Sequence, residues 1–200
     1  MTVELPFSPA CERNREPILE QLQRILPAHA RVLEIGAGTG QHAEWFGRKM
    51  PRWRWLPSDV GTNLWAINAR IAQAELENVL PAVALDVAER LWPPGPFDAV
   101  YSANTLHIMP WPLTALLLED AGKLLKSDGL LIIYGPFQYG GRHTASSNAA
   151  FDADLRRRDP QMGVRDGEEV VVLAASHGLS AEADVAMPSN NRLLIFRKTR

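Results

Sequence analysis

The sequence contains a single cysteine, Cys11, among its 200 residues. One cysteine cannot form an intrachain disulfide, so the chain lacks the disulfide framework of small secreted domains. Its first residues are polar and interrupted by Pro6 and Pro9, where a secretory signal needs an apolar run. These features favour a reducing compartment, and we expect a cytoplasmic protein.

Long apolar runs and an excess of one charge are also missing. No apolar stretch reaches the roughly 20 residues that span a bilayer, so we expect no membrane association. The chain has 21 Lys and Arg against 23 Asp and Glu, a formal net charge of −2. No run of Lys and Arg is longer than Arg156 to Arg158, which follows Asp152 and Asp154, and this pattern predicts a solvated helix face. Bulk charge therefore indicates no nucleic-acid partner.

What the sequence does have is a regular alternation of strand and helix patterns, which predicts a parallel sheet covered by helices. The expected strands are residues 31–35, 53–57, 82–85, 97–102 and 130–134. The expected helices start near residues 17, 41, 64 and 112. Two further strands, 179–186 and 193–196, follow each other across a turn at 187–191. The predicted fold class is α/β: a Rossmann-like, doubly wound, mostly parallel seven-stranded sheet with a C-terminal antiparallel hairpin.

The length suits one domain covering residues 1–200. Residues 1–15 form a polar N-terminal segment, expected to be loose unless it docks, and the first helix is expected to carry Pro17 in its first turn. Residues 135–165 are an insertion with a helix of its own near 148–158, and we expect this insertion to cover an acceptor site.

The strongest local pattern is a glycine-rich turn after the first strand. Its glycines are Gly36, Gly38 and Gly40, and position 41 is glutamine, where a dinucleotide fingerprint would have its third glycine. Glu34 precedes the turn. A carboxylate would repel a pyrophosphate, but it suits the cationic sulfonium of S-adenosyl-L-methionine. The turn therefore predicts an S-adenosylmethionine site.

Acidic residues end the next two strands as well. Asp59 follows the second strand, where a carboxylate can accept both ribose hydroxyls. Asp86 follows the third strand and could bind the adenine amino group, with the Val87 N–H facing a ring nitrogen. Each acid alone is more often a helix cap. Together at one sheet edge, with the glycine turn, they predict a cofactor crevice.

At these residues the chain resembles class I S-adenosylmethionine-dependent methyltransferases along nearly its whole length. Four segments are also similar to the methyltransferase-like 26 family: residues 8–14, 33–42, 102–108 and 134–152. The resemblance implies no established catalytic residue. It implies cofactor contacts at Glu34, Gly36, Gly38, Gly40, Asp59, Asp86 and Asn104.

Asn104 and His107 follow the fourth strand, at the end that overlooks the transferable methyl group in this fold. Alignment of the acceptor with the methyl group can supply much of the rate, so a base is needed only where the acceptor must lose a proton. His107 is the candidate general base, with a hydrogen-bonded wall histidine as the alternative.

Polar residues of the insertion and the N-terminal segment are candidates for acceptor binding. The alternative for the insertion is a polar surface loop, with Asn148 or Ser147 capping its helix. A metal site at His143, Asp152 and Asp154 lacks convincing ligand spacing, so no metal is expected. The candidate acceptor residues are Arg13, Asn14, Tyr134, Arg142, His143, Asn148 and Asp152.

We expect methyl transfer to a small-molecule acceptor. Two alternatives stay open at this point. The first is a non-catalytic module that binds the cofactor or a partner, whose cofactor turn would look the same. The second is an NAD(P)-dependent oxidoreductase, which the glycine spacing and the terminal hairpin disfavour.

Overall fold

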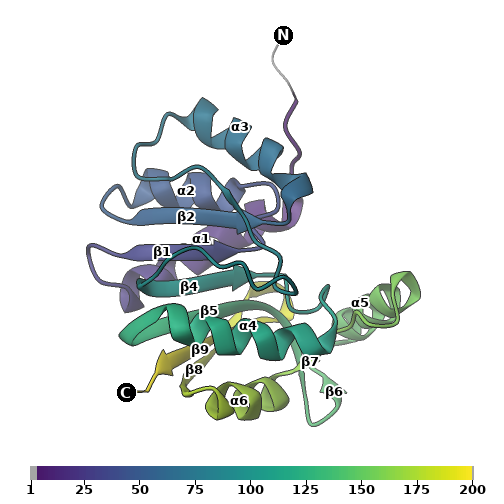
Figure 1. Ribbon diagram of the computed structural model, residues 1–200. Helices are drawn as coiled ribbons and strands as arrows, with labels where there is room; N and C mark the ends of the chain where they lie inside the picture. Colours follow the sequence, from purple (N-terminus) through teal and green to yellow (C-terminus); the bar gives the residue numbers. More distant parts are fainter. Residues whose placement is uncertain (1–3, 200) are drawn as a thin grey trace. The chain divides into compact units, whose positions relative to one another are not determined.

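Strands and helices alternate along the computed structural model, which describes residues 4–199 (Figure 1). The described residues fall into two compact units. The N-terminal unit runs to Pro93 and includes Phe97–Tyr101; the C-terminal unit contains Pro94–Pro96 and the chain from Ser102 onward. The single domain over 1–200 stays a prediction. Among the described residues, no helix combines the length and apolar character needed to cross a membrane.

The N-terminal unit contains three helices and three complete strands, and its last strand, β4, ends in the other unit. Its elements are α1 (Pro9–Ile25), β1 (Arg31–Ile35), α2 (Gln41–Lys49), β2 (Arg54–Asp59), η1 (Gly61–Asn63), α3 (Leu64–Ala74), β3 (Val83–Ala84) and β4 (Phe97–Ala103).

The first helix begins eight residues before Pro17, so the prediction that Pro17 lies in its first turn is wrong. Ser8 caps α1 by accepting a hydrogen bond from the Cys11 N–H, and Pro9 occupies the first helical position, which suits its fixed φ. Pro17 instead lies inside the helix. Burial of Ile18, Leu19 and Leu22 against the core offsets the backbone hydrogen bond that the proline removes.

The sheet of this unit is parallel. Leu33 of β1 pairs with Leu56 of β2, Asp59 of β2 pairs with Ala84 of β3, and β4 follows β1 in the strand order. Helix α2 packs between α1 and α3 (Figure 1). Because parallel strands end at the same edge, the loops after β1, β2 and β3 leave the sheet together.

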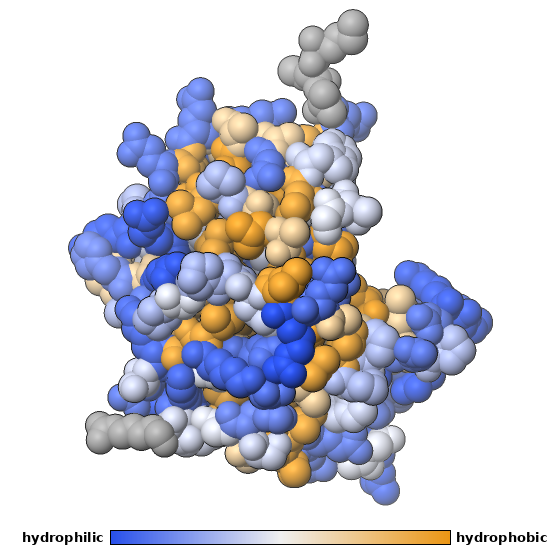
Figure 2. Space-filling view, viewed as in Figure 1, coloured by the Kyte–Doolittle hydropathy of each residue, from blue (hydrophilic) through white to orange (hydrophobic). Residues whose placement is uncertain are grey.

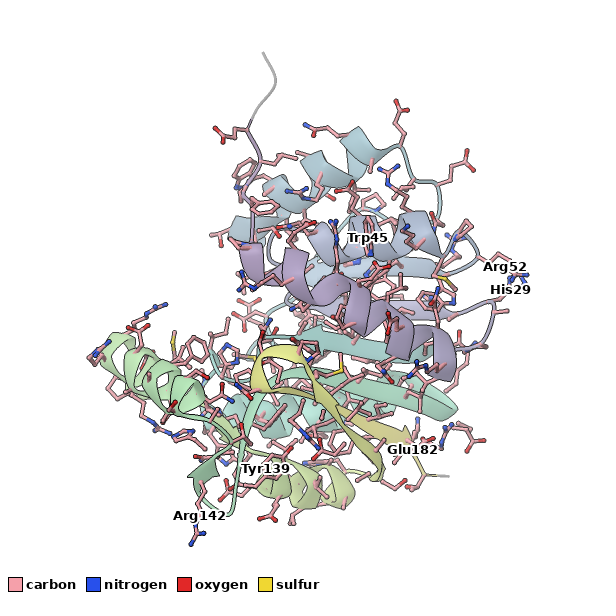
Figure 3. All side chains as sticks on the ribbon, turned by 180° about the vertical axis from the view of Figure 1, so that it is seen from behind. His29, Trp45, Arg52, Tyr139, Arg142 and Glu182 are labelled. Carbon is pink, nitrogen blue, oxygen red and sulfur yellow. The ribbon has the colours of Figure 1, made fainter. Side chains whose placement is uncertain are left out.

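Aromatic side chains fill the core of this unit. Phe46, Trp55 and Tyr101 are fully buried, and their rings meet edge to face with centroids 5.2–5.9 Å apart. Trp45 lies at the surface of α2, where the Arg15 guanidinium stacks 3.8 Å from its ring centroid (Figure 3). The edge-to-face geometry adds specificity to the area that these rings bury.

The C-terminal unit completes the sheet pattern with a long strand and a hairpin. Its elements are α4 (Trp111–Leu124), β5 (Leu125–Tyr139), β6 (Arg142–His143), α5 (Ser146–Arg158), β7 (Arg165–Asp166), α6 (Gly167–Ser176), β8 (Leu179–Met187), η2 (Pro188–Asn190) and β9 (Asn191–Lys198).

Strand β9 is antiparallel to both of its neighbours. Ile132 of β5 pairs with Ile195, and Val185 of β8 pairs with Leu193 across the terminal hairpin. The predicted α/β class, with seven mostly parallel strands and a C-terminal antiparallel hairpin, is thereby confirmed. The sequence did not predict α6, nor the short strands β6 and β7 that pair with the end of β5.

Helix α5 confirms the helix expected in the insertion, and its outer end is hydrophilic (Figure 2). Arg157 and Arg158 pair with Asp154, and Arg156 pairs with Asp152. The basic cluster is therefore partly neutralised by its own helix, as expected of a solvated face.

Gly47 of α2 tests how tightly the N-terminal unit packs. A Cβ added there would lie 2.2 Å from Val79 Cγ2, so we expect Gly47→Ala to lower the free energy of unfolding by about 1–3 kcal/mol despite its better helix propensity. Val79→Ala should relieve the clash, making the double variant more stable than the sum of the two single changes predicts. Urea denaturation measures all three. Gly61→Ala, whose Cβ would meet no atom within 4 Å, is the matched control; equal losses at both glycines would refute this packing.

Candidate functional site

The glycine turn between β1 and α2 has the backbone that its sequence predicts. Gly36, Gly38 and Gly40 have φ values of 73°, 57° and 74°, in the left-handed region that favours glycine. The N–H groups of Gly36 and Ala37 both donate to the Ser58 carbonyl at 3.0 Å. The turn is thus fastened to the end of β2.

Asp59 holds the middle of this turn. Its Oδ2 accepts the Gly38 N–H at 2.6 Å, and its Oδ1 accepts the Val60 N–H at 2.7 Å and the Asn63 amide at 2.8 Å. The side chain is buried at the end of β2. The sequence placed Asp59 near the glycines but did not predict that it hydrogen-bonds to them directly.

Asp86 lies beside Asp59, because the Leu85 N–H donates to the Asp59 carbonyl at 2.9 Å. The Asp86 carboxylate accepts the Ala88 N–H at 2.8 Å, a local turn contact of the capping kind. Val87 is buried next to it. Strand-end acids thus gather at one edge in this unit, while contact of Asp86 and Val87 with adenine stays a prediction.

Glu34 lies under the turn, with 2 % of its surface exposed. Its carboxyl accepts the Trp55 indole N–H at 2.7 Å. Burial raises the pKa of Glu34 to about 7; the Trp55 hydrogen bond opposes this rise and the charge of Asp59 adds to it. With so little exposed surface, Glu34 first of all supports the turn, and its contact with the cofactor stays a prediction.

His42, in the first turn of α2, lies next to Glu34 as a neutral ring. Burial, then the charge of Arg15, lowers its pKa to about 4, against the weaker effect of a hydrogen bond to the Cys11 backbone. His42 Nδ1 is 3.9 Å from the Glu34 carboxyl but 3.2 Å from the Tyr101 hydroxyl. Since the two pKa shifts both favour the uncharged forms, we interpret the Glu34–His42 contact as neutral rather than as an ion pair.

The two acceptor-binding candidates of the N-terminal segment, Asn14 and Arg13, differ in burial. Asn14 is buried, with its Oδ1 2.7 Å from His42 Nε2, whereas the neighbouring Arg13 is exposed. The structure therefore ties Asn14 to the support of the glycine turn. Acceptor binding by either residue stays a prediction.

In the C-terminal unit, Asn104 and His107 come together around Gly135. A Cβ added at Gly135 would lie 3.8 Å from both Asn104 Oδ1 and His107 Nδ1. Asn104 has a φ of 56°, and its N–H donates to the carbonyl of Tyr134, a buried residue of β5, at 2.8 Å. The left-handed turn at Asn104 brings its side chain and that of His107 to the end of β5.

His107 is buried and neutral. Burial, and to a lesser extent the charge of Arg165, lowers its pKa to about 4. Its ring packs edge to face on Phe151 of α5, with centroids 5.2 Å apart. Phe151 and Ile108 are among the exposed large apolar side chains, so apolar surface borders the histidine.

Sequence reasoning missed Arg165, the residue that organises this region. Its guanidinium is buried and donates to the Leu106 carbonyl at 3.1 Å, to the Gln161 carbonyl at 2.8 Å and to the Met109 carbonyl. It thereby holds the loop that carries His107. One arginine in a polar segment gives no pattern from which its burial could be predicted.

Two of the insertion candidates are engaged in internal hydrogen bonds. Asn148 donates to Thr144 Oγ1 and to the Asn190 carbonyl, both at 3.0 Å, so it joins α5 to the hairpin turn. Asp152 accepts the Val164 N–H at 2.7 Å. The structure thus brings Asn148 and Asp152 into the framework of the insertion, and acceptor contact by either stays a prediction.

His143 and Arg142 form the short strand β6. His143 Nε2 lies 3.5 Å from Asp152 Oδ2, and its buried Nδ1 has no hydrogen-bond partner among the described residues. Arg142 is exposed and projects away from the ribbon (Figure 3). Within residues 4–199 no group of three or more His, Cys, Asp and Glu side chains is arranged to hold a metal ion.

A family model described as "Protein of unknown function (DUF938)" matches residues 5–198. The fold is similar to those of many solved structures, among them the following three. The first is an O-methyltransferase family protein from Burkholderia thailandensis, 19 % identical with a TM-score of 0.81, covering 95 % of this chain and 57 % of that one. The second is the S-adenosylmethionine-dependent methyltransferase SibL in its apo form, 22 % identical with a TM-score of 0.81, covering 96 % and 56 %.

The third is CalO1, a methyltransferase of calicheamicin biosynthesis in an SAH-bound form, 16 % identical with a TM-score of 0.71 and coverage of 88 % and 51 %. The chain thus spans just over half the length of these proteins. At such identities the likeness establishes the fold alone, which this chain shares with these three proteins.

The Glu34–His42 pair makes opposite contributions to stability as pH changes. The raised pKa of Glu34 means that the folded state binds more protons than the unfolded state from about pH 4.5 to 7. The contribution of Glu34 to the free energy of unfolding therefore falls as pH rises through this range. The lowered pKa of His42 has the reverse effect from about pH 4 to 6.5. Each slope approaches about 1.4 kcal/mol per pH unit, and the two nearly cancel in the wild type.

We therefore expect Glu34→Gln to gain stability relative to the wild type as pH rises from 4.5 to 7. His42→Gln should lose stability relative to the wild type as pH rises from 4 to 6.5. Urea denaturation at half-unit pH steps measures both differences. The slopes carry the information, because a packing loss shifts a curve without tilting it. Curves parallel to the wild type would show that Glu34 and His42 titrate normally.

Proposed function

The chain belongs to the family described as "Protein of unknown function (DUF938)", and from its fold and site we propose that it is an S-adenosylmethionine-dependent methyltransferase with a small-molecule acceptor. The three methyltransferase structures support the general activity through their fold. The acceptor class rests on the chain's own residues. The narrower resemblance to the methyltransferase-like 26 family is part of this proposal.

One observation carries the proposal: the Asp59 carboxylate, which is proposed to bind the ribose, is hydrogen-bonded to the glycine turn. The three hydrogen bonds that this carboxylate accepts use most of its roughly four acceptor positions, and Asp59 keeps room for about one ribose hydroxyl, on Oδ2. A Cβ at Gly38 would meet no atom within 4 Å, which leaves open space beside the same turn. An adenosyl group with an uncharged ribose fits this acidic, glycine-lined edge, whereas a pyrophosphate would be repelled.

Bound S-adenosylmethionine would supply an activated methyl group. The chain's part is to bind and orient: the turn from Gly36 to Gly40 brings backbone close to the ligand, and Asp59 accepts from the ribose. Asp86 and Val87 are proposed to contact adenine. Orientation of this kind lowers the barrier without proton transfer at the protein.

His107 is the proposed acceptor-facing residue, and Asn104 stays a proposed cofactor contact. His107, the proposed general base, is unprotonated at neutral pH because its pKa is lowered to about 4. It can accept a hydrogen bond from an acceptor hydroxyl, but the same burial makes it a weaker base than an exposed histidine. The exposed apolar side chains of Phe151 and Ile108 favour an acceptor that has apolar surface. The neighbour from Burkholderia thailandensis is named an O-methyltransferase, which agrees with a hydroxyl acceptor.

The two alternatives have less support. An NAD(P)-dependent oxidoreductase needs a glycine at position 41, where this chain has a buried glutamine. A non-catalytic module would retain the cofactor turn but gives no role to the buried, neutral His107.

We also propose that the protein acts in the cytoplasm, without a nucleic-acid or membrane partner.

Calorimetric titration with S-adenosylmethionine, S-adenosylhomocysteine and NADH tests this function. We expect both adenosyl compounds to bind and NADH not to bind. Asp59→Asn should weaken both by about tenfold or more, because charge-assisted hydrogen bonds are lost. Asp154→Asn, which removes an equal charge from an exposed ion pair, is the control and should bind normally. Binding of NADH alone, or unchanged binding by Asp59→Asn, would contradict the proposal.

A further inference from the structure

The polar segment Pro6–Asn14, here called the N-terminal strap, lies against the glycine turn. The Ser8 N–H donates to Gln41 Oε1 at 2.6 Å, and the Gln41 amide donates back to the Ser8 carbonyl at 3.3 Å. Gln41 Oε1 also accepts the Thr39 hydroxyl at 2.9 Å. Gln41 therefore joins the strap to the last residues of the turn.

Arg70 of α3 makes a second connection. Its Nε donates to the Thr39 carbonyl at 2.8 Å, and a terminal nitrogen donates to the Pro6 carbonyl at 2.8 Å. The other terminal nitrogen pairs with Glu44 of α2 at 3.3 Å. The planar guanidinium can hold three partners in fixed directions, which a lysine cannot. One side chain thus fixes the strap, the turn and α2 together.

The strap also brings a thiol to the turn. Cys11 is partly buried, and its backbone N–H donates to Ser8 Oγ at 3.3 Å. Burial raises the pKa of its thiol and the nearby charge of Glu34 adds to the rise, while the side chains of Ser8 and Thr39 act to lower it. Since Thr39 belongs to the turn and Glu34 lies beneath it, Cys11 is a reporter located at the proposed cofactor site.

The strap has little buried surface, and its contacts with Gln41 and Arg70 are polar. None of residues 4–13 is buried, and Phe7 is 61 % exposed. Asn14, which bonds His42, is the first buried residue, and the apolar core begins at Ile18. Segments with few buried apolar contacts open at low free energy while the rest of the fold persists. The strap can therefore leave the turn without unfolding the later part of α1.

We propose that the N-terminal strap closes on the glycine turn together with the cofactor, with Arg70 and Gln41 as the positioning residues that couple the two events. This inference rests on the proposed function, because the cofactor is the ligand that shares the turn. Gln41 and Arg70 link the strap to Thr39 of the turn, and the cofactor is proposed to bind the same turn, so each is expected to favour the ordered turn that the other needs. Two ligands of one ordered element bind cooperatively.

Because Cys11 is the only cysteine, its reaction with a thiol reagent reports on the strap directly. The experiment follows the rate of modification by 5,5′-dithiobis(2-nitrobenzoate) with and without saturating S-adenosylhomocysteine, alongside calorimetry of the same ligand. We expect the ligand to slow the modification by about tenfold or more in the wild type.

Arg70→Met and Gln41→Met remove the connections while keeping side-chain length. Each should speed the reaction of Cys11 without ligand and weaken S-adenosylhomocysteine binding by about tenfold. Arg48→Ala is the matched control, because Arg48 pairs with the same Glu44 without reaching the turn or the strap. A variant that is merely less stable would show a lower Tm, but the ratio of its Cys11 modification rates without and with S-adenosylhomocysteine would equal that of the wild type.

The outcomes separate the two proposals. Failure of the wild type to bind S-adenosylhomocysteine would overturn the proposed function, and this inference with it. Binding that leaves the Cys11 rate unchanged, or that Arg70→Met and Gln41→Met do not weaken, would overturn the strap and leave the function standing. Protection of Cys11 that both substitutions abolish would establish the coupling.

Discussion

The hydrogen bond from the Gly38 N–H to the Asp59 carboxylate is the contact on which the N-terminal unit's site depends. It joins the loop after β1 to the end of β2, and the two N–H groups that donate to the Ser58 carbonyl reinforce it. A turn with three residues at positive φ has little intrinsic preference for one shape, so its shape comes from these partners. The carboxylate defines the turn and is also the group proposed to bind the ribose.

Two sets of residues support the turn: a buried cluster that includes aromatic rings, and the polar side chains that bind the strap. Glu34 and His42 are buried in a cluster with Trp55 and Tyr101, where burial shifts the pKa of each group in the direction that favours its neutral form. Two uncharged partners avoid the cost of burying an ion pair. Gln41 and Arg70 bind the strap through hydrogen bonds that open at lower free energy. A buried, rigid cluster on one side of the turn and a strap that can open on the other suit a site that must admit a ligand and then enclose it.

Strong local patterns were predictable from the sequence, and contacts between distant residues were not. The bounds of β1 and the alignment of Asp59 with the glycine turn follow from strand and turn chemistry. The start of α1 was misplaced because Pro17 resembles an N-terminal proline, while the actual cap, Ser8, lies in a segment with no apolar periodicity. The contacts Asn14–His42 and Arg70–Pro6 join residues 28 and 64 positions apart. Arg165 was missed for the same reason: its partners are backbone carbonyls, which every residue has.

Hydrogen–deuterium exchange with and without S-adenosylhomocysteine locates the ligand on the chain. We expect the ligand to slow exchange at the amides from Gly36 to Gly40 and from Asp59 to Asn63, and to leave exchange in the hairpin of β8 and β9 unchanged. Exchange that stays the same in the glycine turn while the ligand is bound would contradict the assignment of this turn as the cofactor site.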